Sequence, residues 1–273
     1  MGQNQIQDPA LWVPEEVPVD KPSPARIYDY LLGGYHNFEC DRKVVDQMLE
    51  QYPDMMESAQ VNRGFLRRAV HYLLKQGIDQ FLDIGSGIPT VGNVHELAQA
   101  YSPEARVYYV DIDPIAVSHS KAILEDNPNA AAIQADVRDT DKILNHPEVV
   151  KLLDFNKPLG LMIVATIHYV VDDEDAQGAV ERLRNALSVG SYLTLSQPVD
   201  IASPENMEDL KNSFKPAANT KIRSREDIAQ FFSGLEIIEP GLVFAPQWRP
   251  ESPNELGLDH PEKSFTLAAI GRK

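Results

Sequence analysis

The sequence Asp83-Ile84-Gly85-Ser86-Gly87-Ile88-Pro89 lies between a short apolar run and a segment with helical periodicity. Glycines at a strand-to-helix turn let the backbone bend tightly and approach a ligand closely. In open α/β sheets, ligands bind at this edge, outside the carboxyl ends of the strands. A dinucleotide fingerprint needs a third glycine, where this chain has Thr90. The turn therefore predicts a site for a nucleoside rather than a pyrophosphate, the alternative being a tight turn without a ligand.

Short apolar segments recur about every 25 residues from this turn onward, and helical patterns separate them. Such alternation predicts βαβ units with right-handed crossovers and a parallel sheet. The segment at 161–165 is apolar throughout, which indicates a strand covered on both faces. The expected strands are 80–84, 106–110, 131–134, 161–165, 192–195, 235–239 and 264–271.

The residues before the first strand have a different pattern. Residues 1–22 are polar and rich in proline, which predicts an extended arm. Helical periodicity follows at 25–32, 41–50 and 57–76. We therefore predict a single domain over 23–273, with a helical cap at 23–77 and an α/β core at 78–273. A proline-rich loop at 245–261 is expected to be either a lid or a cover for the sheet edge.

Carboxylates stand where two further strands are expected to end. Asp111 follows the second strand, and in nucleotide sites an acid there accepts from the ribose hydroxyls. Asp136 follows the third strand, where its carboxylate can accept from the amine of adenine while the Val137 amide donates to a ring nitrogen. Each acid could instead cap a helix, and Asp113 is expected to do so. With Ile112 beside Asp111, these residues predict the walls of a nucleoside site.

The composition limits the partners. The chain has 273 residues, with 25 Lys and Arg against 41 Asp and Glu, and its net charge is −16. Such an acidic chain repels phosphate backbones, so no nucleic-acid partner is expected. It has neither an apolar run long enough for a bilayer nor a signal-peptide pattern, so no membrane is expected. The single cysteine, Cys40, favours a cytoplasmic protein, and the oligomeric state is left open.

These motifs resemble those of the class I S-adenosylmethionine-dependent methyltransferases. Asp83-x-Gly85-x-Gly87-x-Pro89 is similar to their first motif, Asp111 to their second-strand acid and Asp136 to their adenine-contacting acid. The segment Ala25-Arg26-Ile27-Tyr28-Asp29-Tyr30-Leu31-Leu32-Gly33-Gly34 resembles a bacterial family of such enzymes whose substrates are largely unassigned. The resemblance implies an α/β fold with a Rossmann-like, seven-stranded, mostly parallel sheet of order 3-2-1-4-5-7-6. It also implies an N-terminal helical cap and S-adenosyl-L-methionine as the cofactor.

Further residues are expected to hold this cofactor. Arg63 or Arg26 could pair with its carboxylate, and Tyr28 or Tyr30 could face its cationic sulfonium. The alternative is that Arg63 is an exposed arginine on a helix and that Tyr28 is an aromatic residue of the core. The expected cofactor-binding residues are Tyr28, Arg63, Asp83, Gly85, Ser86, Gly87, Asp111, Ile112, Asp136, Val137, Ala165 and Thr166.

A candidate for acid–base chemistry follows the fourth strand, in Ala165-Thr166-Ile167-His168-Tyr169. His168 is the expected general base, since an imidazole titrates near neutral pH. Tyr169 is a weaker candidate, and His168 could instead bond to the backbone or line the pocket. No metal site is expected, because the histidines fall on separate elements without ligand spacing.

The sequence therefore predicts an S-adenosylmethionine-dependent methyltransferase that acts on a small molecule by in-line transfer. Its helical cap and its acidity favour a small methyl acceptor over a nucleic acid. One alternative is a protein that binds S-adenosylmethionine or its by-product without catalysis. A nicotinamide-dependent oxidoreductase is less favoured, because the third glycine of the fingerprint is missing. The acceptor and its reacting atom are left open.

Overall fold

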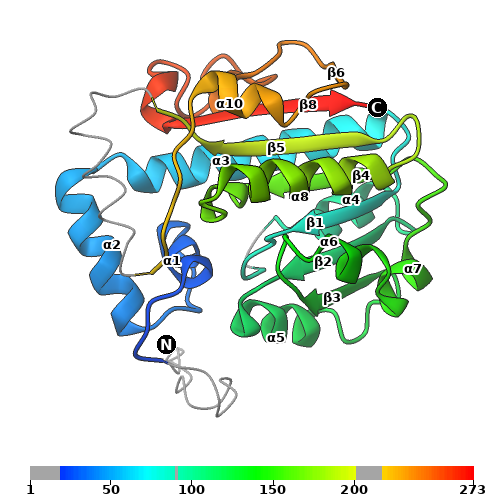
Figure 1. Ribbon diagram of the computed structural model, residues 1–273. Helices are drawn as coiled ribbons and strands as arrows, with labels where there is room; N and C mark the ends of the chain where they lie inside the picture. Colours follow the sequence, from blue (N-terminus) through cyan, green and yellow to red (C-terminus); the bar gives the residue numbers. More distant parts are fainter. Residues whose placement is uncertain (1–18, 90–91, 201–216) are drawn as a thin grey trace.

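The computed structural model describes residues 19–89, 92–200 and 217–273. The predicted arm at 1–22 lies outside these ranges up to residue 18. Figure 1 shows a central sheet with helices on both faces and with α1 and α2 at one end. The predicted helices at 25–32, 41–50 and 57–76 correspond to α1 (Pro24–Leu31), α2 (Glu39–Gln51) and α3 (Met55–Lys75). No helix in the described part of the chain combines the length and apolarity needed to cross a membrane.

The sheet has the predicted topology. Its order is β3-β2-β1-β4-β5-β8-β6, which is 3-2-1-4-5-7-6 when the seven expected strands are numbered along the chain. The neighbours from β3 to β5 are parallel, and β8 runs antiparallel to β5 and β6. A short β7 (Val243–Phe244) pairs with β8 and was not predicted. The other strands are β1 (Gln80–Ile84), β2 (Arg106–Asp111), β3 (Ala130–Gln134), β4 (Gly160–Val164), β5 (Tyr192–Pro198), β6 (Glu236–Ile237) and β8 (Thr266–Arg272).

Helices cover both faces of this sheet, which explains why its central strands are apolar throughout. One apolar core joins α3 and α4 to the sheet through residues such as Phe65, Val94 and Phe81. The core on the opposite face joins α8 and α10 to β4 and β5 through residues such as Val180 and Ile228. The remaining helices are α4 (Val94–Tyr101), α5 (Pro114–Ile123), α6 (Thr140–Leu144), α7 (Pro147–Leu152), α8 (Asp173–Ala186) and α10 (Arg225–Gln230).

The cap has an apolar cluster of its own, in which Ile27, Val45 and Met48 are buried between α1 and α2. Pro24 occupies the first turn of α1, where its missing N–H costs no hydrogen bond. In Figure 1, α1 and α2 lie beyond the end of the sheet to which the parallel strands point. The cap therefore faces the edge at which α/β proteins bind their ligands.

The start of the loop at 245–261 packs against α3. Trp248 is fully buried, and Arg68 of α3 donates to the carbonyl oxygens of Ala245 (2.7 Å) and Trp248 (2.8 Å). The Trp248 ring lies edge-on to Phe65, with 5.5 Å between the ring centroids. These contacts fasten the start of the loop between α3 and β8. Its role as a lid or as a cover for the sheet edge stays a prediction.

Candidate active site

A cavity of about 500 Å³ lies at the carboxyl ends of β1 to β4, and residues of α1 and α3 also line it. Its size is within the range of roughly 300–1,000 Å³ for sites that bind small ligands. Every residue predicted to bind the cofactor lines it, whereas the predicted base His168 does not, and neither does the loop at 245–261. The predicted residues it brings together are Tyr28, Arg63, Asp83, Gly85, Ser86, Gly87, Asp111, Ile112, Asp136, Val137, Ala165 and Thr166.

The glycine turn after β1 depends on the absence of side chains. Gly85 has a φ of +70°, and a Cβ there would lie 2.2 Å from Cγ2 and Oγ1 of Thr166. The Thr166 hydroxyl lies 3.0 Å from the Val164 carbonyl oxygen and 3.2 Å from that of Gly85, so it ties this turn to the end of β4. Gly87 has a φ of +67°, and its N–H points at the Asp111 carboxylate. The turn thus fixes the floor of the cavity.

Asp111 holds the turn after β2 to the glycine turn. Its Oδ2 accepts from the Gly87 N–H at 2.7 Å, and its Oδ1 accepts from the Asp113 N–H at 2.8 Å. Burial raises the pKa of this carboxyl to about 6, although the backbone hydrogen bonds oppose that rise. Because a carboxylate offers about two acceptor positions on each oxygen, each oxygen can still accept from one hydroxyl. Asp113 caps α5 as predicted, accepting from the Ile115 N–H at 2.7 Å.

A buried acid and an arginine face each other between β1 and α3. Burial raises the pKa of Asp83 to about 7, and the positive charge of Arg63 opposes that rise. The Arg63 Nε is buried and has no hydrogen-bond partner within the described ranges. Its guanidinium carbon lies 5.8 Å from the centre of the Tyr28 ring. An arginine with such an Nε in an acidic cavity is a group that can receive a carboxylate.

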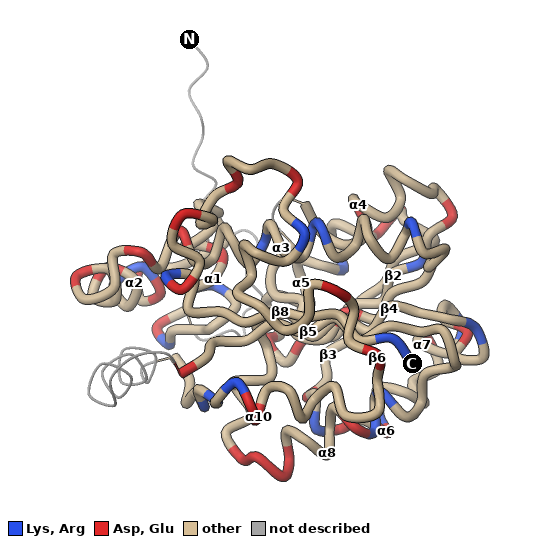
Figure 2. The backbone as a smooth tube through the Cα atoms, turned by 90° about the horizontal axis from the view of Figure 1, so that it is seen from above, with Lys and Arg blue, Asp and Glu red and all other residues tan. Residues whose placement is uncertain are grey.

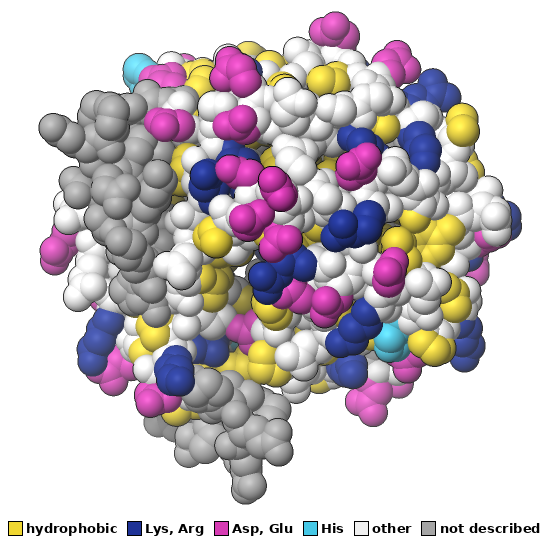
Figure 3. Space-filling model, viewed as in Figure 1, with side chains coloured by type: hydrophobic (Ala, Val, Ile, Leu, Met, Phe, Trp, Pro, Cys, Tyr) yellow, Lys and Arg dark blue, Asp and Glu magenta, His cyan; other side chains and the backbone are white. Residues whose placement is uncertain are grey.

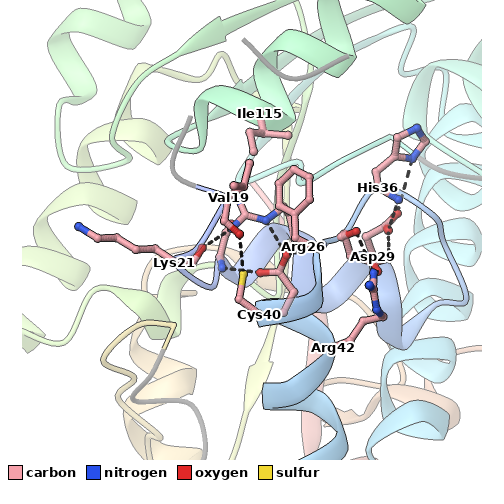
Figure 4. A network of polar contacts seen from close by, with 12 residues as sticks. Val19, Lys21, Arg26, Asp29, His36, Cys40, Arg42 and Ile115 are labelled. Carbon is pink, nitrogen blue, oxygen red and sulfur yellow. Dashed lines mark hydrogen bonds and ion pairs between the residues drawn. The ribbon is translucent and has the colours of Figure 1, made fainter. Parts of the chain in front are cut away.

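Arg26, the other arginine predicted to pair with the cofactor carboxylate, already pairs with an acid of the cap. Figure 4 shows it within the cap, where its Nε donates to Asp41 Oδ2 at 2.7 Å. Asp41 also accepts from the Ser23 N–H at 2.9 Å, so the start of α1 is fastened to α2. Asp29 accepts from the His36 N–H at 2.8 Å and from Asn37 Nδ2 at 2.9 Å. The 25–34 segment that carries the family resemblance therefore includes residues that fold the cap.

The Tyr28 side chain is fixed by a residue that the sequence analysis missed. Asn62 Nδ2 donates to the Tyr28 hydroxyl at 2.9 Å, and Asn62 Oδ1 accepts from the Ser196 hydroxyl at 2.6 Å. The Tyr28 hydroxyl lies 3.2 Å from the Ala59 carbonyl oxygen. Asn62 is a polar residue on the buried face of α3, and this position in an otherwise apolar stripe was the available signal.

Asp136 lies in the cavity as predicted, but its carboxylate is already paired. Arg138, two residues later, donates to it from Nε at 3.0 and 3.1 Å and from Nη2 at 2.5 Å. These hydrogen bonds lower the pKa of Asp136 below its usual range. Arg138 also lines the cavity and was not predicted, because nothing in the sequence indicates a side chain that folds back on its neighbour.

His168 does not occupy the position predicted for a general base. It is buried outside the cavity, and burial together with the charge of Arg223 lowers its pKa to about 3. Residues three apart in a 3₁₀ turn point the same way. Thr166 and Tyr169 therefore both face the cavity around the turn Ile167–Tyr169, whereas His168 points elsewhere. Burial raises the pKa of Tyr169, so its phenol stays protonated at neutral pH.

The charged side chains around the cavity are mostly carboxylates. Within the described ranges, no lysine, histidine or cysteine lines it, and no cluster of residues suited to hold a metal was found. An acidic cavity favours a cationic ligand over an anionic one. The charged lining residues are Asp83, Asp111, Asp113, Asp136, Asp172, Asp175, Arg63 and Arg138.

The sheet order, the glycine turn and the acid at the end of β2 define the class I methyltransferase fold. The sequence matches the S-adenosyl methyltransferase family over residues 10–273, and the chain belongs to this family. Its cofactor is S-adenosyl-L-methionine. No match to the chain was found among curated proteins.

Solved structures resemble the whole chain. A predicted methyltransferase from Thermobifida fusca YX is 42% identical, with a TM-score of 0.90 over 96% of this chain and 99% of that one. A DUF574 family protein from Streptomyces avermitilis MA-4680 is 36% identical, with a TM-score of 0.88 over 94% of this chain and 100% of that one. An O-methyltransferase family protein from Burkholderia thailandensis shares only the fold, at 13% identity and a TM-score of 0.53 over 80% of this chain and 58% of that one.

Proposed function

We propose that this protein transfers the methyl group of S-adenosyl-L-methionine to a small molecule bound in the same cavity. The observation that carries the proposal is the convergence of all the predicted cofactor residues, from four strand ends and the cap, on one cavity. The family supplies the cofactor and the reaction type, and the cavity supplies the site.

The residues of the cavity fit the parts of this cofactor. We assign the free acceptor positions of Asp111 to the ribose hydroxyls. We assign the Arg63 guanidinium, whose Nε has no hydrogen-bond partner among the described residues, to the cofactor carboxylate. Asp83 lies beside Arg63 and suits the ammonium group. Ile112, a residue that is 62% exposed, and Val137 offer apolar walls for the adenine ring. When bound, the cofactor would supply a methyl group on a cationic sulfur. The acceptor would bond to the methyl carbon in line as the carbon–sulfur bond breaks, and neutral S-adenosylhomocysteine would be the leaving group.

The protein contributes position and exclusion of water rather than an obvious base. Pro22 and the cap residues Ser23, Pro24 and Ala25 form part of the cavity wall, which limits the room for a large acceptor. Figure 2 shows Lys and Arg interspersed with acidic residues, without a continuous basic run along the described backbone. A basic run is what a nucleic-acid acceptor needs. A small acceptor in the cytoplasm, consistent with the unpaired Cys40, is therefore our proposal.

One observation favours a second candidate, a protein that binds S-adenosylmethionine or its by-product without turnover. His168 does not line the cavity, and its lowered pKa makes it a weak base. Methyl transfer to an acceptor that carries no acidic proton needs no base, however, so the first candidate retains preference.

Calorimetric titration with S-adenosylmethionine, S-adenosylhomocysteine and NAD tests the proposal. We expect micromolar binding of the first two and none of NAD. Asp111→Asn should weaken both by about 5- to 150-fold, which corresponds to about 1–3 kcal/mol for a lost buried acceptor. Incubation with a metabolite pool then separates the candidates, because only an enzyme converts S-adenosylmethionine to S-adenosylhomocysteine. Binding of NAD, or equal affinities for the wild type and Asp111→Asn, would contradict the assigned site.

A further inference from the structure

One neighbour takes most of the acceptor positions of Asp136. Its Oδ1 accepts from the Arg138 backbone N–H at 2.9 Å and from Nε at 3.0 Å. Its Oδ2 accepts from Nε at 3.1 Å and from Nη2 at 2.5 Å. A carboxylate offers about four acceptor positions. The Nε–H is a single donor shared between the two oxygens, so three N–H groups of Arg138 occupy about three of these positions. An amine of the adenine ring therefore competes with the Arg138 side chain for Asp136.

Such a movement is inexpensive. The Arg138 side chain is 54% exposed, and that of Asp136 is 19% exposed. Ion pairs at exposed positions contribute little to stability, because water solvates the separated charges nearly as well. The backbone N–H of Arg138 would keep its bond to Asp136, so only the guanidinium needs to leave.

A second carboxylate is available to the guanidinium at the same cavity. Asp175, in the first turn of α8, lines the cavity together with Arg138. After the hydrogen bonds and charge of Asp136, the charges of Asp175 and Asp139 further raise the pKa of Arg138. Figure 3 shows acidic side chains gathered over the N-terminal end of α8, with basic side chains beside them. Asp139 does not line the cavity.

We propose that Arg138 is an arm with two positions at the adenine end of the cavity. In one position its guanidinium pairs with Asp136, and in the other it pairs with Asp175 and leaves Asp136 to the adenine amine. Arg138 thereby competes with the cofactor in the first position and closes over it in the second. This inference rests on the proposed function, because it takes the ligand to be an adenosyl cofactor.

A double-mutant cycle measured by calorimetry and by dissociation rate tests the arm, with S-adenosylmethionine and S-adenosylhomocysteine as probes. Asp175→Asn should weaken both by about three- to fivefold and speed their dissociation, because the second position is lost. In the Arg138→Met background, Asp175→Asn should have no such effect. In the Asp175→Asn background, Arg138→Met should tighten binding, because only the competing position remains. Asp139→Asn is the matched control and should leave both affinities unchanged.

The outcomes separate this inference from the proposed function. If Asp175→Asn weakens binding equally with and without Arg138, its effect is general electrostatic attraction and the arm is wrong. If Arg138→Met weakens binding in the Asp175→Asn background, Arg138 holds the cofactor directly and the arm is again wrong. If the wild-type protein binds neither probe, the proposed function fails, and the arm fails with it. Thermal unfolding of each variant checks that the exposed substitutions leave the fold intact.

Discussion

The two ends of the cavity are built by different means. At the nucleoside end, which comprises the turns after β1, β2 and β3, backbone groups fix the site, as in the bond from the Gly87 N–H to Asp111. At the cap end, side chains hold other side chains, as in the contact of Tyr28 with Asn62 and of Asn62 with Ser196. The difference teaches that strand topology sets the position of the turns at the first end, whereas the second end depends on how particular side chains pack.

The largest effect should come from filling the nucleoside end. Gly85→Val places a branched side chain at a positive φ and against Thr166, so it should lower the free energy of unfolding by about 3–5 kcal/mol and abolish cofactor binding. Gly87→Ala is the matched control, because its Cβ meets no atom within 4 Å, and it should cost only about 1–2 kcal/mol. Chemical denaturation measures both. Equal losses would show that the positive φ, and not the contact with Thr166, dominates.

Asp83 lies where the two ends of the cavity meet. The effect of its substitution on the free energy of unfolding should depend on pH. Because burial raises its pKa to about 7, the folded protein keeps this proton while the unfolded chain loses it near pH 4. The wild type should therefore lose stability relative to Asp83→Asn as the pH rises from 4 to 7, by about 2–4 kcal/mol in total. Urea unfolding across this range measures the difference. A constant difference would mean that Asp83 is ionised in the folded protein throughout.

Arg63 tests whether the cap end recognises the amino-acid part of the cofactor. Arg63→Met keeps the apolar stem but removes the guanidinium. S-adenosylmethionine should therefore bind about 10-fold more weakly, which is a loss of about 1.5 kcal/mol in binding free energy. Adenosine lacks the carboxylate and should bind both proteins alike. Calorimetry with S-adenosylmethionine and with adenosine measures the ratio of the wild-type affinity to the variant affinity for each ligand. An equal loss for adenosine would move Arg63 from the cap end of the site to the nucleoside end.

The smallest effect is expected from His168. Because its side chain does not line the cavity, His168→Asn should change the affinity for S-adenosylmethionine by less than about twofold, well below the roughly 1.4 kcal/mol of a tenfold change. With an acceptor in hand, the pH profile of turnover should also keep its shape. A large loss of turnover at unchanged affinity would restore His168 to the reaction.

The contrast between the two ends also explains what the sequence could predict. Residues at or close behind the end of a parallel strand, such as Asp111 and Thr166, lie at one edge because parallel strands end there together. His168 comes four residues after the end of β4, and its direction depends on a 3₁₀ turn that periodicity does not reveal. The Arg138 pair and the Asn62 bridge are choices among side-chain rotamers. A sequence pattern carries no information on such choices.

The packing of α3 also bears on how the protein is made. The Ser58 hydroxyl donates to the Ser264 carbonyl oxygen at 2.6 Å, and Arg68 reaches the loop that precedes β8. Roughly 190 residues separate the end of α3 from β8, so a ribosome needs about 10–40 s to supply the partners of this helix. During that time the part of α3 that packs against this loop and β8 lacks its final partners. A chaperone that shields apolar helices should therefore bind the nascent chain in this interval and leave once β8 has been made.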